Sequence, residues 1–95
     1  MEIKEFQNLI YRIYFKKDSA RGVGNTFQWF TEEVGELARA IRKKERKLME
    51  EEFADCFAWL TSLASINGVD MEDAVLKYKD GCPKCGEMEC ECEEK

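Results

Sequence analysis

Apolar side chains recur along most of this chain at the three- and four-residue intervals of an amphipathic helix. Segments with this pattern run over residues 2–17, 27–43 and 48–66, and a shorter segment follows at 71–79. No internal repeat, heptad array or sustained two-residue alternation typical of a strand accompanies them. The sequence therefore predicts an all-α fold, a bundle of helices.

Glycine and capping residues predict the breaks between these helices. We expect a loop over residues 18–26, because it holds two glycines, with Asn25 or Thr26 capping the helix that follows. A charged turn is expected near residues 42–47, and Asp70 should cap the short last helix.

The size of the chain predicts association. A 95-residue domain that is 44% hydrophobic and 37% charged is typical of a small helical protein and not of a disordered one. A domain this short buries only about 60–65% of its unfolded surface, so an isolated copy is marginally stable. We therefore expect the bundle to be completed by oligomerisation, as a homodimer or a homotetramer.

Charge and hydropathy exclude several classes of partner. The net charge is −5 and no dense basic stripe is present, which argues against binding to a nucleic-acid polymer or an anionic membrane. No apolar run approaches the roughly 18 residues of a membrane span, and the N-terminus lacks a signal-peptide core. We expect a cytoplasmic protein whose cysteines are reduced.

Two pairs of acidic residues are the strongest chemical signal. Glu33 and Glu36 are spaced i, i+3 in one predicted helix, and Glu52 and Asp55 have the same spacing in the next. Each pair lies on one helix face, so two adjacent helices can bring four carboxylates together. Such a cluster needs a cation, and hard oxygen ligands favour Mg²⁺ or Mn²⁺.

The angular position of each pair around its helix distinguishes a metal site from an ordinary charged surface. At about 100° per residue, Glu52 falls inside the apolar stripe of its helix and Asp55 just outside it. A buried carboxylate is costly unless it is paired or bound to metal. The alternative for either pair alone is a surface charge, with Glu52 paired to Arg39 or Arg42, but two such pairs together favour the metal site.

The pattern Glu-Glu-x-x-Glu, 15 intervening residues and Glu-x-x-Asp resembles the signature of MazG-like nucleotide pyrophosphohydrolases, in the all-α NTP pyrophosphohydrolase superfamily. The likeness covers residues 5–79, including Arg21-Gly22 and the segments 26–30 and 68–75. It implies Mg²⁺-dependent hydrolysis of a nucleoside triphosphate to the monophosphate and pyrophosphate, with a role in clearing unwanted nucleotides from the pool.

The resemblance also implies which residues act. It places the metal ligands at Glu33, Glu36, Glu52 and Asp55. Glu32 then either positions and deprotonates the attacking water or supports the ligands, and we favour the first role.

The segment before the first acidic motif offers candidate substrate contacts through hydrogen bonding, charge and stacking. These residues are Arg21, Asn25, Gln28 and Trp29. Trp29 as a core aromatic and Arg21 as a solvated loop residue are equally compatible with the sequence. Trp59 and Phe57 follow an apolar stripe and are predicted to be core.

The last residues form a separate segment, with a domain at 1–79 and a cysteine-rich tail at 80–95. Its cysteines have the spacing C-x₂-C-x₄-C-x-C, at Cys82, Cys85, Cys90 and Cys92. Four thiolates can close a tetrahedral zinc site resembling a zinc knuckle, although C-x-C is less typical of structural zinc than C-x₂-C. Reduced or redox-active thiols are the alternative. The tail also replaces the Asn- and Lys-containing end of many relatives.

A second class of function remains open on the sequence alone. The chain could be a zinc-containing helical binding or regulatory module without turnover. The position of Glu52 on an apolar stripe argues against that reading, because metal chemistry supplies a reason for it.

Overall fold

The computed structural model describes residues 1–93, and every regular element in that range is a helix. The elements are α1 (Ile3–Arg21), α2 (Val23–Lys43), α3 (Arg46–Ile66), α4 (Met71–Ala74) and the 3₁₀ turn η1 (Val75–Tyr78). The all-α prediction is confirmed.

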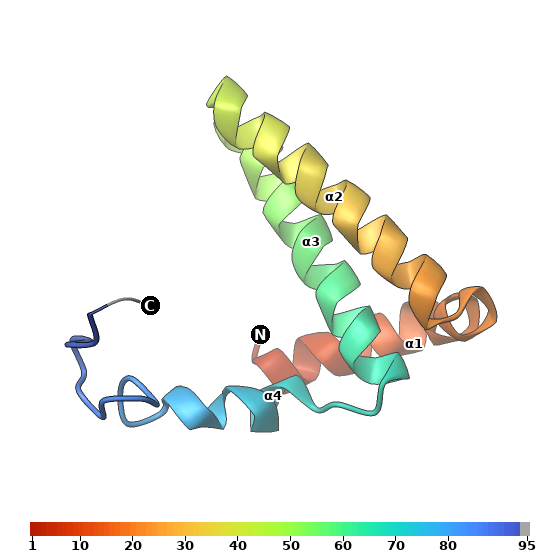
Figure 1. The fold of residues 1–95 in the computed structure, drawn as a ribbon. Helices are drawn as coiled ribbons and strands as arrows, with labels where there is room; N and C mark the ends of the chain where they lie inside the picture. The colour runs from red at the N-terminus through yellow and green to blue at the C-terminus, as the bar shows by residue number, and fades with distance from the viewer. Residues whose placement is uncertain (94–95) are drawn as a thin grey trace.

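α2 and α3 form a long antiparallel hairpin, and α1 lies across one end of it (Figure 1). The hairpin turns at Lys44, which adopts a left-handed conformation with φ 58° and donates its N–H to the carbonyls of Ala40 and Ile41. This connection lies within the charged segment where the sequence predicts a turn. Residues of α2 and α3 that are far apart in the sequence therefore face each other across the hairpin.

The predicted loop over residues 18–26 is wrong. α1 continues to Arg21 and α2 begins at Val23, so the chain leaves helical geometry only at Gly22, with φ 86°. Asn25 and Thr26 lie inside α2 and do not cap it. The two helices continue up to Gly22 from either side because Arg21 bonds Thr26 of α2 and packs on the Trp59 ring of α3, and such tertiary contacts outweigh weak local propensity.

The end of the helical domain is joined to α1 by the side chain of Gln7, which is 8% exposed. Its amide nitrogen donates to Ser65 Oγ at 3.1 Å and to the Val69 carbonyl at 2.9 Å, and its oxygen accepts from the Met71 N–H at 2.8 Å. These bonds hold α4 against the start of α1 (Figure 1).

The predicted helix at 71–79 is only partly α-helical. Asp70 caps it as expected, because its carboxylate accepts from the N–H groups of Glu72 and Asp73. After Ala74 the chain tightens into η1, and the tail beyond Tyr78 runs away from the α2–α3 hairpin (Figure 1).

The described chain buries little apolar surface. Its buried hydrophobic residues are Ile10, Ala40 and Cys56. Many large apolar side chains stay exposed on all three long helices, including Ile13 at 54% and Phe53 at 55%. In residues 1–93, no helix combines the length and the apolar content that crossing a membrane requires.

Candidate functional site

Three carboxylates meet between the two arms of the hairpin. Glu33 projects from α2, and Glu52 and Asp55 project from successive turns of α3. One oxygen from each lies within 4.8 Å of the other two. The i, i+3 spacing places both α3 residues on the same face, toward the helix that carries Glu33.

Glu52 is the most constrained member of the cluster. It is half-buried, and its Oε2 atom is shielded from solvent with no hydrogen-bond partner in the described chain. Burial raises the pKa of Glu52, and the charges of Asp55 and Glu36 raise it further. A shielded, unpartnered carboxylate oxygen is costly, so this atom is the group that most favours binding of a cation.

The pKa of Glu33, on the opposite helix, is raised by the same two causes, burial and neighbouring negative charge. Burial raises its pKa, followed by the charges of Glu52, Asp55, Glu36 and Glu32.

Glu36, predicted as a fourth ligand, is exposed and does not belong to the group of oxygens within 4.8 Å. Its charge is nevertheless close enough to act on both Glu33 and Glu52. Glu32 is exposed next to Glu33 on the same helix, and its charge also acts on Glu33.

The donor set fits a hard divalent cation. Within residues 1–93, no lysine or arginine forms an ion pair with the three clustered carboxylates, so the expected alternative of Glu52 paired to Arg39 or Arg42 is not observed. Adjacent Cys56 is buried, and burial followed by the charge of Glu33 raises the pKa of its thiol. The potential ligand atoms that lie within 4.8 Å of one another here are carboxylate oxygens, which Mg²⁺ prefers.

A cavity of about 240 Å³ opens beside the carboxylates, between α1 and α3. Its lining comprises Tyr14, Lys17, Asp18, Arg21, Asp55, Ala58, Trp59 and Ser62. Asp55 thus belongs to both the carboxylate cluster and the cavity. A larger hollow of about 530 Å³ lies along the first turns of α1 and includes none of these carboxylates.

Arg21 anchors one wall of this cavity. Its Nη1 atom donates to Asp18 Oδ1 at 2.8 Å and to Thr26 Oγ1 at 3.3 Å. The guanidinium also lies 4.9 Å from the centre of the Trp59 ring, within cation–π range. Trp59 in turn stacks on Trp29, with 6.0 Å between ring centres and 11° between planes.

The structure separates the four predicted substrate residues. Arg21 lines the cavity, and Trp29, which is 48% exposed, reaches it through the stack with Trp59. Asn25 and Gln28 are exposed on α2 and do not line it. The amide of Asn25 donates to the Arg21 carbonyl.

Trp59 and Phe57 are not core residues as predicted. Trp59 is half-buried and lines the cavity, and Phe57 is 38% exposed and stacks on Phe6. The apolar stripe of α3 is wide enough to serve contacts on two sides. Periodicity alone cannot tell a fully buried stripe from one that borders a cavity.

Tyr14, Lys17 and Asp18 were missed as cavity residues. Tyr14, Lys17 and Arg21 occupy one face of α1 at i, i+3 and i+7, a spacing visible in the sequence. The expected end of the helix at residue 17 removed Arg21 from that face and hid the pattern.

Comparison with known families identifies the helical domain. The sequence model of the MazG nucleotide pyrophosphohydrolase domain matches residues 21–85, more than half of the chain. The chain belongs to this family. Its members are nucleotide pyrophosphohydrolases, and the matched region contains the three clustered carboxylates together with Arg21 and Trp59. No curated protein sequence matches the chain.

A second cluster lies outside the helical domain. The Sγ atoms of Cys82, Cys85, Cys90 and Cys92 all lie within 4.8 Å of one another, and none forms a disulfide. Backbone N–H donation from Glu91 lowers the pKa of Cys85 to about 6, and a hydrogen bond shared with Cys90 raises the pKa of Cys92 to about 11.

Proposed function

We propose that this protein is a Mg²⁺-dependent nucleoside triphosphate pyrophosphohydrolase, which converts an NTP and water to an NMP and pyrophosphate. Membership in the MazG family supports the reaction class. The observation that carries the proposal is the shielded, unpartnered Oε2 atom of Glu52 beside two other carboxylates from facing helices. A role in removing non-standard or surplus nucleotides follows from that reaction.

Glu33, Glu52 and Asp55 would hold the cation, and Glu36 would join them or bind through a water. Mn²⁺ has the same preference for oxygen ligands and is the substitute we expect. When bound, the ion neutralises phosphate charge and lowers the pKa of a coordinated water. Three clustered carboxylates would otherwise repel a triphosphate.

The cavity beside Asp55 is the proposed place for part of the nucleotide. Lys17 forms no ion pair in the described chain, and it lies on the cavity with Arg21, so cationic groups face the position of the phosphates. The Trp29–Trp59 stack supplies an aromatic surface for the base. At about 240 Å³ the cavity is smaller than the roughly 300–1,000 Å³ of typical ligand sites.

A second copy of the chain would complete the helical bundle and cover the exposed helix faces. The small buried core and the exposed Ile13, Phe27 and Phe53 side chains support a homodimer or homotetramer. Light scattering over a range of concentrations tests this. A stable monomer at all concentrations contradicts it.

Glu32 is the proposed positioning residue for the attacking water. The water oxygen would bond to the α-phosphorus, the bond from that phosphorus to the bridging oxygen would break, pyrophosphate would leave with the bridging oxygen, and the carboxylate would accept the proton released by the water. Histidine is absent from the sequence, which leaves a carboxylate as the available base. Glu32→Gln should lower kcat while leaving Mg²⁺ affinity unchanged.

The proposal is tested by measuring pyrophosphate release from a panel of NTPs with and without Mg²⁺. Native protein should release pyrophosphate only with the metal, and Glu52→Gln and Asp55→Asn should abolish release. Glu50→Gln is the matched control, because Glu50 lies on the same helix in an exposed ion pair with Arg46.

Inactivity of the native protein toward every NTP contradicts the enzymatic proposal. That outcome favours the alternative of a zinc-containing binding or regulatory module, which the cysteine cluster supports.

Free thiols and a nucleotide substrate support a cytoplasmic location.

A further inference from the structure

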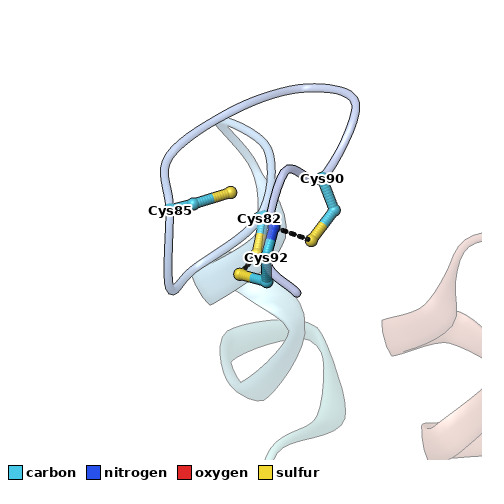
Figure 2. A group of neighbouring side chains, drawn as sticks. All are labelled: Cys82, Cys85, Cys90 and Cys92. Atoms are coloured by element: carbon cyan, nitrogen blue, oxygen red, sulfur yellow. Dashed lines mark hydrogen bonds between the residues drawn. The ribbon is translucent and has the colours of Figure 1, made fainter. Parts of the chain in front are cut away.

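The tail after η1 is ordered around its cysteines. Its described part, residues 79–93, contains no helix or strand, yet the chain closes on itself so that four sulfur atoms meet. Figure 2 shows Cys85 entering from one side of the loop and Cys90 from the other, with Cys82 and Cys92 between them. A segment this short cannot form a hydrophobic core, so another interaction must specify its fold.

Backbone hydrogen bonds shape the first half of this loop as a tight turn. The Gly86 N–H donates to the Cys82 carbonyl at 2.7 Å, and the Cys82 N–H donates to the Glu87 carbonyl at 2.8 Å. Gly81 has φ 114°, and a Cβ atom placed there would lie 2.7 Å from the Glu87 oxygen. The turn therefore requires glycine at position 81.

Further N–H groups point at the sulfur atoms themselves. The Glu91 N–H donates to Cys85 Sγ at 3.5 Å. The Cys92 N–H donates to Cys90 Sγ at 3.4 Å (Figure 2). Donation to sulfur stabilises the thiolate, which is the form that binds metal. The loop thus places backbone N–H donors at two of its four sulfurs, those of Cys85 and Cys90.

We propose that Cys82, Cys85, Cys90 and Cys92 bind one zinc ion as a closed tetrahedral site. Zn–S bonds of about 2.3 Å set ligand sulfurs roughly 3.8 Å apart at the edges of a tetrahedron. The Cys82 and Cys92 sulfurs are 3.9 Å apart, and all four lie within 4.8 Å, so only a small contraction completes the shell. Soft thiolates exclude Mg²⁺, and four protein ligands leave no open position for a substrate.

This site is distinct from the carboxylate cluster. The tail lies beyond η1 and away from the α2–α3 hairpin that carries Glu33 and Glu52 (Figure 1). The zinc is structural: binding supplies the free energy that orders the tail, as in other small metal-dependent folds. Each metal is matched to its site by ligand chemistry, Mg²⁺ to oxygen and zinc to sulfur.

Metal analysis of the full chain, purified without chelator, tests the proposal. We expect one zinc per chain, lost in Cys82→Ser and in Cys90→Ser and retained in Cys56→Ser, whose sulfur lies in α3. Circular dichroism should show the helices intact in Cys82→Ser and Cys90→Ser, because the tail is remote from the hairpin, and in Cys56→Ser, because serine is close to cysteine in size. Folded native protein without zinc, with one iron per chain, or with disulfides within the tail would overturn the proposal.

A second comparison separates the metal site from general effects of mutation. Gly81→Ala introduces the clash with the Glu87 carbonyl, whereas a Cβ at Gly86 meets nothing within 4 Å although both glycines have positive φ. Competition with a chromogenic zinc chelator should give at least a tenfold weaker affinity for Gly81→Ala, the scale of supporting-shell changes, and a smaller loss for Gly86→Ala. Equal affinities for Gly81→Ala and native protein would contradict the assigned geometry.

Discussion

Replacing Arg21 with methionine should test the anchor that joins α1 to the cavity wall. The substitution keeps much of the aliphatic side chain but removes the guanidinium that bonds Asp18 Oδ1 at 2.8 Å. The Asp18 side chain is only 5% exposed, so water entering from the cavity replaces the lost donor only in part. A buried carboxylate is then left without its cation.

The structure sets the size of the effect. Removing one partner of a fully buried pair costs about 3–5 kcal/mol. The Arg21 side chain is 22% exposed, so we expect a smaller loss of about 2–3 kcal/mol, the upper range for a hydrogen bond to a charged group. At about 4–8 °C per kcal/mol for a domain of this size, the Tm should fall by roughly 10–20 °C.

The assay is urea unfolding followed by circular dichroism, at one protein concentration because association also affects stability. Adding Asp18→Leu to Arg21→Met removes the buried charge, so the double variant should be more stable than the sum of the single changes predicts, by about 1–2 kcal/mol. An unchanged urea midpoint for Arg21→Met, or strictly additive losses, would refute the reasoning.

Two further predictions concern the pH dependence of stability and the hydrogen bonds of Gln7 that join α1 to α3 and α4. Because the pKa values of Glu33 and Glu52 are raised, the folded state binds a proton at each carboxyl group more tightly than the unfolded chain does. The free energy of unfolding of metal-free protein should therefore fall as pH rises from 4.5, the ordinary pKa of a glutamate, through the raised pKa values. Glu33→Gln should flatten that fall in Tm, and Mg²⁺ at neutral pH should reverse it; parallel curves for both proteins would sink this account. Gln7→Leu removes three hydrogen bonds and should cost about 3 kcal/mol in urea unfolding, whereas Asn8→Ala on the exposed side of the same helix should cost little, and equal midpoints for both would be inconsistent with the network.

The helices were predictable because their signals are local. Apolar spacing gave the all-α class, and Asp70 was identified as a cap from its own position and residue type. The break between the first two helices was not predictable in the same way. Ser19 and Gly24 weaken helix propensity, and the contacts that hold both helices past them, from Arg21 to Thr26 of α2 and to the Trp59 ring of α3, depend on the tertiary fold.

The candidate site also combines features that are local in the sequence with features that depend on the tertiary structure. The i, i+3 spacing of Glu52 and Asp55, and the phase of Glu52 on its helix, are properties of one segment and could be derived from residue numbers. The distance between these carboxylates and Glu33 depends on how α2 and α3 are registered across the hairpin. That register excludes Glu36 from the closest group although its sequence spacing is equally favourable.

By itself, the sequence determined which side chains share a helix face and which residue types could bind hard or soft metals, because both depend on short-range geometry and on donor chemistry. Tertiary structure alone decided that Lys17, Arg21 and Trp59 border one cavity beside Asp55, and that four cysteine sulfurs meet in the tail. Those outcomes depend on packing between elements and on chain reversal, where small shifts in register or in a glycine turn move a side chain by several ångströms. No periodicity within a single segment encodes such distances.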